Sequence, residues 1–292
     1  MAIWNLGSIN VDHVYRVPHL PAPGETLAAL SYATGLGGKG ANQSVAAARA
    51  GARVCHIGAV GAEGGWALRK LGALGVDLAH VAEVAPATGH AIINVDPLAE
   101  NAIVIYAGAN VALTEGQMIG AMALSAETDT VLLQNETNLQ VETAREARAR
   151  GLRVIYSAAP FSIAAVQAVL SLVSLLVMNE GEASALVAAL GQPLDALPVA
   201  GVIVTKGSRG AEWISAGTET LLQPSFAVTP VDTTGAGDCF IGSLAAALDR
   251  GDGRAAAMRY AAAAAALQVT RPGAADAMPT RAEVEAFLAT QP

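Results

Sequence analysis

The chain has 292 residues, enough for two average domains or for one large α/β domain with a substantial buried core. It is 53% hydrophobic and only 14% charged, against about 25% charged in typical globular proteins, so it must fold compactly. Its 17 Lys and Arg against 25 Asp and Glu give a formal net charge of -8 without a basic run, which argues against a nucleic-acid partner.

The cysteines and the apolar segments indicate the compartment. Cys55 and Cys239 are far apart and match no ligand spacing, so we expect neither a disulfide framework nor a zinc site. The N-terminus lacks the basic and long apolar regions of a signal peptide, and the most apolar later window, 163–178, is too short to span a bilayer. These features predict a soluble protein of the reducing cytoplasm, without a membrane segment.

Short apolar runs alternate with helical patterns along most of the chain. This alternation favours a mainly parallel sheet that is covered by helices on both faces. The expected strands are 2–8, 53–58, 130–134, 153–157, 172–178 and 201–205. The expected helices are 41–50, 66–74, 139–150, 240–248 and the alanine-rich 255–267. No flexible linker divides these elements, so we expect a single domain, 1–292.

Two regions interrupt the alternation. Residues 14–34 are punctuated by Pro and Gly, and residues 89–106 alternate apolar and polar residues around a turn at 97–101. Both patterns predict antiparallel hairpins. We expect them to form a small sheet, of about residues 13–35 and 89–107, that stands off the main body.

A polar pair, Asn10 and Asp12, follows the first expected strand. Residues two apart in an extended chain project from one face, so an amide and a carboxylate would grip adjacent hydroxyls of a ligand. An Asx turn would explain the same pair.

A glycine-rich segment, 35–43, leads into the first expected helix. It satisfies the dinucleotide pattern G-x-G-x-x-G, but it does not follow the first strand, and no acid ends the next one. It also fails as a phosphate-binding P-loop, because Gly40 stands where Ser or Thr should follow Lys39. What is left is a tight backbone with Lys39 and Asn42, which suits a polyhydroxylated ligand, or a plain turn with a solvated lysine.

The most informative string is 232–238, Asp-Thr-Thr-Gly-Ala-Gly-Asp, just before a helical pattern. A Gly235, Ala236 and Gly237 turn at a helix start leaves backbone N–H groups and the helix dipole facing an anion, such as a phosphoryl group. Asp238 in the first turn would accept the proton of an attacking hydroxyl. The alternative is that Asp238 only caps the helix, and the second acid in the string weighs against it.

Together these strings resemble the ribokinase family, also called the PfkB carbohydrate kinases, from end to end of the chain. The matching strings stand in family order: GSINVD at 7–12, GGKGANQ at 37–43, AGAN at 107–110, NEGE at 179–182, TKGSRG at 205–210 and DTTGAGD at 232–238. The second and third are most similar to the ribokinase branch. The resemblance implies a three-layer α/β/α sandwich with a mainly parallel central sheet and a small antiparallel β lid.

The resemblance also implies transfer of the γ-phosphate of ATP to the primary hydroxyl of a sugar, D-ribose in this branch. Asp238 would be the base, the 235–237 amides would form the anion hole, and the lid would exclude water. The residues implied to contact the sugar are Asn10, Asp12, Gly38, Lys39, Asn42, Glu136 and Asp238. Glu136 follows the strand expected at 130–134, at the carboxyl end where open α/β sheets place ligands.

By the same resemblance, Thr205, Gly207 and Gly237 approach the nucleotide phosphates, and Asn179 and Glu182 organise Mg²⁺ and its waters beside them. Taken alone, the pair Asn179 and Glu182 is typical of a capping box at a helix start. The neighbouring cations, Lys206 and Arg209, are weaker candidates, because the family role rests on the flanking backbone and threonine.

A monovalent-cation site is implied as well. Asp232, Thr234, Arg271 and Gly273 stand at the positions that match a K⁺ site of the family, the last two through their backbone carbonyls. A hydroxyl that the family supplies a few residues later falls on Ala277, so the strength of K⁺ activation is in doubt.

Other functions stay open at this point. Another pentose, fructose, a 2-keto-3-deoxy acid or a nucleoside would suit a kinase of this family. A catalytically inactive sugar-binding module would keep the sugar contacts, whereas here the base and its glycines are present. A dinucleotide oxidoreductase rests only on the misplaced glycine pattern. By the resemblance, the lid hairpins would also pair between subunits and bury their apolar face, which implies a homodimer through the lid.

Overall fold

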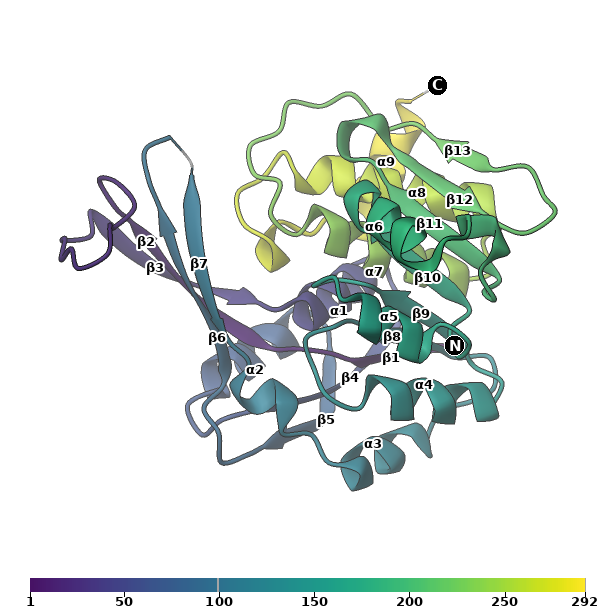
Figure 1. Ribbon diagram of the computed structural model, residues 1–292, viewed down its shortest axis with the longest axis horizontal. Helices are drawn as coiled ribbons and strands as arrows, with labels where there is room; N and C mark the ends of the chain where they lie inside the picture. The colour runs from purple at the N-terminus through teal and green to yellow at the C-terminus, as the bar shows by residue number, and fades with distance from the viewer. Residues whose placement is uncertain (99, 292) are drawn as a thin grey trace.

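The computed structural model describes residues 1–98 and 100–291. Ala99, in the predicted turn at 97–101, and Pro292, at the end of the predicted domain, lie outside the described residues. The chain forms a large sheet between two layers of helices, and a smaller sheet rises from one side of this body (Figure 1).

Nine strands make up the large sheet. They are β1 (Ala2–Leu6), β4 (Arg53–Val60), β5 (Asp77–Glu83), β8 (Thr130–Leu133), β9 (Arg153–Ser157), β10 (Leu175–Asn179), β11 (Gly201–Thr205), β12 (Ala211–Ile214) and β13 (Leu221–Gln223). Their order is β13-β12-β11-β10-β9-β8-β1-β4-β5. The pairings from β5 to β11 are parallel, whereas β12 and β13 extend the edge in antiparallel fashion.

Helices cover both faces of this sheet. They are α1 (Lys39–Arg49), α2 (Gly65–Ala73), α3 (Glu115–Met122), α4 (Gln140–Ala149), α5 (Ile163–Val169), α6 (Glu180–Leu190), α7 (Ala236–Asp249), α8 (Arg254–Gln268) and α9 (Arg281–Ala289), with 3₁₀ turns at Gly108–Val111, Leu194–Ala196, Gly207–Arg209 and Ala275–Ala277. Within the described ranges, no helix has both the length and the apolar character that a bilayer span requires.

Two apolar cores lie on the two faces of the sheet. Successive strand residues point to opposite faces, so Ile3 joins the core under α1, α2, α7, α8 and α9, while Trp4 joins the core under α3 to α6. Strands buried on both faces read as continuous apolar runs, which is the pattern of the sequence. The predicted three-layer sandwich is confirmed.

The predicted elements are present, and their ends differ in two informative places. α7 begins at Ala236, before the predicted start at 240, because the glycine-rich turn is itself the first turn of the helix. β10 begins at Leu175 instead of 172, since the backbone N–H of Leu172 donates to the carbonyl of Val169 and closes the preceding helix.

The small sheet consists of β2 (Asn10–Arg16), β3 (Ser31–Gly37), β6 (Gly89–Val95) and β7 (Asn101–Tyr106), in the order β3-β2-β6-β7. The hairpins β2–β3 and β6–β7 are antiparallel, as predicted. The two central strands, however, pair in parallel. The reason is that β2 and β6 follow β1 and β5, two strands that run in the same direction through the large sheet, so both leave it at the same edge.

Candidate active site

The residues predicted to bind a sugar gather at one edge of the large sheet. β1 and β8 pair in parallel, so the segments that follow their carboxyl ends come together there. These segments carry Asn10 and Glu136. The first turns of α1 and α7 reach the same place with Lys39 and Asp238.

Asp238 is buried, with 8% of its surface exposed. Its two carboxylate oxygens accept hydrogen bonds from α1, Oδ2 from Asn42 Nδ2 and Oδ1 from Gln43 Nε2, each at 3.0 Å. The residue before α7 is Gly235, in a left-handed conformation, and no side chain caps the helix. Asp238 is therefore not a helix cap. Burial raises the pKa of its carboxyl, while the Lys39 charge and the two amides act in the opposite direction.

A buried chain of amides supports Asp238. Gln43 Oε1 accepts from Gln134 Nε2 at 2.8 Å, and the same nitrogen donates to Asn5 Oδ1 at 2.9 Å. All three amide side chains are buried. Because Gln134 donates to its Oε1, Gln43 must turn its N–H toward Asp238, and this arrangement favours the ionised, hydrogen-bond-accepting carboxylate.

The far end of this chain fixes its direction. Asn5 Nδ2 donates to Ser44 Oγ at 2.8 Å, Ser44 Oγ lies 2.8 Å from His56 Nδ1, and His56 Nε2 lies 3.0 Å from the carbonyl oxygen of Gly7. A carbonyl only accepts, so Nε2 carries the proton and Nδ1 accepts from Ser44. Burial lowers the pKa of His56 to about 4, so the ring is neutral at pH 7. The donor and the acceptor of each hydrogen bond in this network are therefore fixed.

A second acidic group lies beside the base. Glu136 Oε2 accepts from the backbone N–H of Lys39 at 2.9 Å and from the Ser8 hydroxyl. Burial, and then the charge of Glu136, raise the pKa of Asp12 to about 6. The predicted sugar contacts thus form one electrostatically coupled group.

The amides of this group present unsatisfied atoms. Asn110 Nδ2 donates to Asn10 Oδ1 at 2.7 Å, while Asn110 Oδ1 accepts from the backbone N–H of Ile9 at 2.9 Å. This pairing leaves the N–H groups of Asn10 for a ligand. Asn42 Oδ1 is buried, and it has no partner among residues 1–98 and 100–291. A ligand hydroxyl would accept a hydrogen bond from the Asn10 amide or donate one to Asn42 Oδ1.

Two glycines make room for these side chains. Gly38 has a φ of 90°, and a Cβ there would lie 3.0 Å from the backbone N of Asn10. A Cβ at Gly37 would lie 2.2 Å from Asp12 Oδ2. Neither position tolerates a side chain without displacing the predicted sugar contacts.

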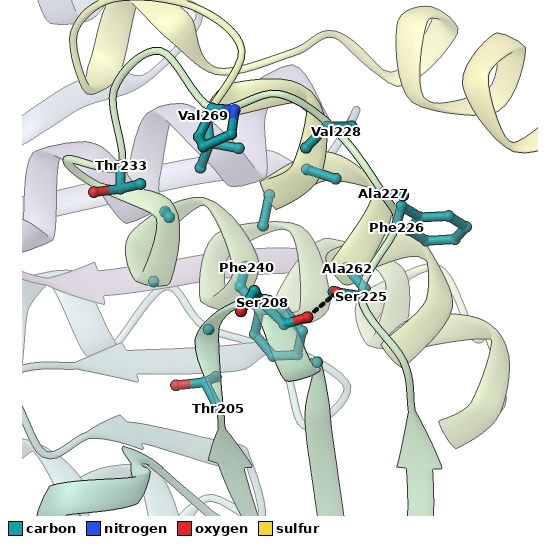
Figure 2. Close-up of a pocket in the computed structure, with 17 residues that line it drawn as sticks. Thr205, Ser208, Ser225, Phe226, Ala227, Val228, Thr233, Phe240, Ala262 and Val269 are labelled. Carbon is teal, nitrogen blue, oxygen red and sulfur yellow. Dashed lines mark hydrogen bonds between the residues drawn. The ribbon is translucent and has the colours of Figure 1, made fainter.

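A cavity of about 500 Å³ adjoins Asp238 on the side of the C-terminal half. The predicted nucleotide contacts Thr205, Gly207 and Gly237 line it, together with Ala236. Most of the remaining wall is apolar: Phe226, Ala227, Val228, Pro230, Phe240, Ala262, Ala265, Ala266 and Val269. Figure 2 shows Thr205 and Thr233 on one side of the cavity and Phe226 and Val228 toward the other.

The sequence did not indicate this apolar wall. The alanine-rich segment 255–267 predicts a helix, and nothing in the sequence indicates that Ala262, Ala265 and Ala266 of α8 face a cavity. Their small side chains take up little of the cavity that they line. On the polar side, the backbone N–H of Ala236 donates to the Thr233 carbonyl at 3.2 Å, so a bound anion would have to share it.

Asn179 and Glu182 form a capping box at the start of α6. Asn179 Oδ1 accepts from the backbone N–H of Glu182 at 2.9 Å, and Glu182 Oε2 accepts from that of Asn179 at 2.7 Å. The other carboxylate oxygen, Glu182 Oε1, takes no part in the capping box and could accept a hydrogen bond from a metal-bound water. In the described part of the chain, no group of three or more His, Cys, Asp or Glu is placed to hold a metal ion. This donor set fits Mg²⁺ that is held mainly by phosphates and waters.

The two cations of the nearby segment are paired with acids. Lys206 forms an ion pair with Glu212, and Arg209 forms one with Glu180. Both cations are partly neutralised, which agrees with their low rank as predicted phosphate ligands.

The predicted K⁺ ligands come together, with a glutamine among them. Asp232 Oδ1 accepts from the backbone N–H of Thr234 and Oδ2 from that of Gly273, both at 2.9 Å. Against the effect of burial, these bonds lower the pKa of Asp232. Gln268 Nε2 donates to the carbonyls of Thr234, at 2.8 Å, and Gly273, at 3.0 Å. Arg271 turns its guanidinium to Glu283, at 2.7 Å.

The model of the pfkB family of carbohydrate kinases matches residues 3–281. The chain belongs to this family. The PfkB kinase is 38% identical to the ribokinase of Haemophilus influenzae, over 97% of each chain. It is 37% identical to that of Bacillus subtilis, over 97% of this chain and 98% of the other. It is similar to the structure of Arabidopsis thaliana ribokinase complexed with ribose and ATP, with a TM-score of 0.87 and 31% identity over 99% of each chain.

Family membership confirms the predicted class of enzyme. This PfkB kinase is a phosphotransferase that acts on a sugar and uses ATP. The dinucleotide oxidoreductase is thereby excluded. The roles of individual site residues stay predictions, supported by the geometry described above.

Proposed function

We propose that this PfkB kinase phosphorylates the primary hydroxyl of D-ribose to give ribose 5-phosphate. One observation carries the proposal. The Asp238 carboxylate is hydrogen-bonded to Asn42 in the predicted sugar group, while the residues just before it, Ala236 and Gly237, line the predicted nucleotide cavity. The base therefore lies at the boundary between the two substrates. The ribokinase relatives make ribose the first choice of sugar.

The residues divide the chemistry between them. Asp238 accepts the proton of the sugar hydroxyl while the hydroxyl oxygen attacks the γ-phosphorus in line, and the bond from the γ-phosphorus to the bridging oxygen breaks, so that ADP leaves. Asn42 and Gln43 hold the carboxylate in place, so positioning precedes reaction. The N-terminus of α7 faces the charge that spreads over the phosphoryl oxygens. Glu182 would help to hold Mg²⁺ through a water, and the ion would supply positive charge that neutralises part of the phosphoryl charge.

Replacing the base tests the proposal. We expect Asp238→Asn to lower kcat about 10³-fold, because the proton acceptor is lost, while the dissociation constant for ribose changes only a few-fold. A coupled assay of ADP release measures kcat, and titration calorimetry measures ribose binding. Asp249→Asn, at the other end of α7, is the matched control and should keep normal turnover. Near-normal turnover of Asp238→Asn would refute the role of this residue.

A substrate panel tests the sugar. Ribose, 2-deoxyribose, fructose, a 2-keto-3-deoxy acid and a nucleoside are each given with MgATP. Ribose should have the highest kcat/KM, and a higher value for another compound would reassign the substrate. Failure of every compound to release ADP would favour the inactive sugar-binding module.

We also propose that the four-stranded sheet is the lid and the dimer surface. β2 carries Asn10 and Asp12 from the sugar group into this sheet, so a sugar bound there touches the sheet directly. β7 exposes apolar side chains, among them Ile103 at 50% and Ile105 at 59%. A second copy would cover them.

The cytoplasm is the expected compartment, since Cys55 and Cys239 are both free.

A further inference from the structure

Gln268, the last residue of α8, is completely buried beside the anion-hole turn. Its Nε2 lies between two backbone carbonyl oxygens from separate loops, Thr234 O at 2.8 Å and Gly273 O at 3.0 Å. Converging carbonyls are typical ligands of a cation. Here an amide group from the chain itself occupies the space between them.

Only the nitrogen end of the amide suits this place. Two carbonyl oxygens would repel a third oxygen, whereas an NH₂ group offers each of them one hydrogen. Gln268 Oε1 is buried and finds no partner in the described part of the chain. Leaving such an acceptor unpaired opposes folding, so the two bonds of Nε2 must outweigh that cost.

The acid of this site already has hydrogen-bond donors on both of its oxygens. The Asp232 carboxylate already accepts the backbone N–H groups of Thr234 and Gly273, so each loop gives it one donor. Ala277, in the same segment as Gly273, has a methyl group and no oxygen ligand. The donor set therefore fits a site filled by an amide better than an open K⁺ site.

The position of this amide affects the catalytic turn. Thr234 directly precedes Gly235, whose φ is 79°, so the orientation of the Thr234 carbonyl also sets the direction of the turn that follows. A Cβ on Gly235 would lie 3.0 Å from the Cβ of Ala274, so the two loops are packed together at this point. Gln268 thus joins both loops where the anion hole begins.

We propose that Gln268 takes the place of a monovalent cation and makes this kinase independent of K⁺. The proposal rests on the proposed kinase function of the same site. Its Nε2 holds the Thr234 and Gly273 carbonyls in the arrangement that a cation would otherwise impose, so the N-terminal turn of α7 is already ordered for the phosphoryl group.

The first test compares turnover with and without K⁺. Tris-ATP, MgCl₂ and ribose are supplied with either KCl or tetramethylammonium chloride at equal ionic strength. The native enzyme should change by less than about twofold, since the general salt effect is matched. Without K⁺, the kcat of Gln268→Ala should be at least about tenfold lower than that of the native enzyme, because the turn is no longer held. Addition of K⁺ should raise the kcat of this variant several-fold.

The control removes a similar bond elsewhere. Gln117 Nε2 in α3 also donates to two backbone carbonyls, those of Gly58 at 2.7 Å and His80 at 2.9 Å. Gln117→Ala should lower thermal stability as Gln268→Ala does, but its turnover should stay normal and should not respond to K⁺. A general loss of stability would affect the two variants alike.

Thermal melting supplies a second readout that does not depend on turnover. Gln268→Glu places a carboxylate among carbonyl oxygens, so KCl should raise its melting temperature by about 2–4 °C over tetramethylammonium, while the native protein should show no difference. A native enzyme activated several-fold by K⁺, or a Gln268→Ala enzyme with full activity without K⁺, would overturn the proposal. If no sugar is phosphorylated, the proposed function fails, and the melting comparison still decides the role of Gln268.

Discussion

At Asp12, the proposed role in sugar binding conflicts with the stability of the folded protein. Burial and the charge of Glu136 raise its pKa from 3.8 to about 6. A carboxyl with a raised pKa stabilises the folded state below the unfolded pKa and loses that contribution as pH rises through the folded one. Between about pH 4 and 6 the folded protein keeps this proton while the unfolded chain has lost it, so stability falls as pH rises, and at pH 7 the ionised Asp12 opposes folding by about 1–3 kcal/mol.

Asp12→Asn should therefore stabilise the free enzyme at pH 7 and weaken its sugar binding. We expect the free energy of unfolding at pH 7 to rise by about 1–2 kcal/mol and the KM for ribose to rise at least about tenfold. Urea denaturation at pH 5 and pH 7 and initial-rate kinetics measure the two effects. In the native enzyme, KM should increase as pH falls through 6, when Asp12 becomes protonated.

An exposed acid provides the comparison. Asp195→Asn in the 3₁₀ turn Leu194–Ala196 should change neither stability nor KM. If Asp12→Asn destabilises the free enzyme at pH 7, the ionised carboxylate must be stabilised by its surroundings, contrary to the direction given above.

The acids and asparagines of the site were predictable, but its glutamines were not. Asn10, Asp12 and Asp238 stand next to glycines or strand ends, where a polar side chain has a clear chemical interpretation. Gln43 lies within the string 37–43, yet the sequence does not determine toward which atoms its amide turns. Gln268 ends an alanine-rich helix, where no periodic pattern marks it. Their roles depend on partners that only the folded chain brings near.

At the scale of elements, the crossing of α1 and α7 sets the position of the base. Gly242 of α7 lies against α1, and a Cβ there would be 2.4 Å from the carbonyl oxygen of Gln43 and 2.7 Å from Ala46 Cβ. The two helices carry Asp238 and its partners Asn42 and Gln43. Their close approach therefore positions the carboxylate as well as packing the core.

Gly242→Ala should force these helices apart. We expect the free energy of unfolding to fall by about 1–3 kcal/mol, and kcat to fall as well, because the bonds to Asp238 lengthen. Chemical denaturation and steady-state kinetics measure the two losses. Gly120→Ala in α3, where a Cβ meets nothing within 4 Å, should instead stabilise by about 0.5–1 kcal/mol and leave kcat unchanged. An active, stable Gly242→Ala enzyme would contradict this account of the crossing.

Most helices and strands were predictable from the sequence, whereas the pairing between strands was less predictable. Apolar runs such as 153–157 and 201–205 coincide with β9 and β11, because strands buried on both faces have no polar alternation to obscure them. The parallel pairing of β2 with β6 was not predictable, since the strands are far apart in the sequence and each already has a hairpin partner. The nucleotide cavity was missed because its wall is built of ordinary core residues.

At the scale of the whole molecule, the faces of the small sheet differ in character. Val14, Ile93 and Ile103 stand opposite one another on β2, β6 and β7, and side chains alternate between faces along each strand. They therefore form an apolar row on one face. The row that includes Val104 lies on the other face, where Ile92 stands between Val104 and His13.

Ile103→Glu should disrupt the proposed dimer. A carboxylate in the apolar row would be buried in the dimer without a partner, so the molar mass in solution should fall from that of two chains to that of one. Light scattering coupled to size exclusion measures it. Val104→Glu, on the opposite face, should remain dimeric. A native protein that elutes with the mass of one chain, or a Val104→Glu protein that alone dissociates, would reject this interface.

The position of β1 in the sheet has a consequence for biosynthesis. β1 leaves the ribosome before β4 and β8, yet it lies in the interior of the large sheet, between these two strands. One edge of this fully buried strand has no partner until residue 133 has been synthesised. During that interval the nascent chain exposes an apolar strand edge to other chains. After β8, the strands from β9 to β13 are added in sequence order, each beside its predecessor, so the second half of translation extends a template that is already formed.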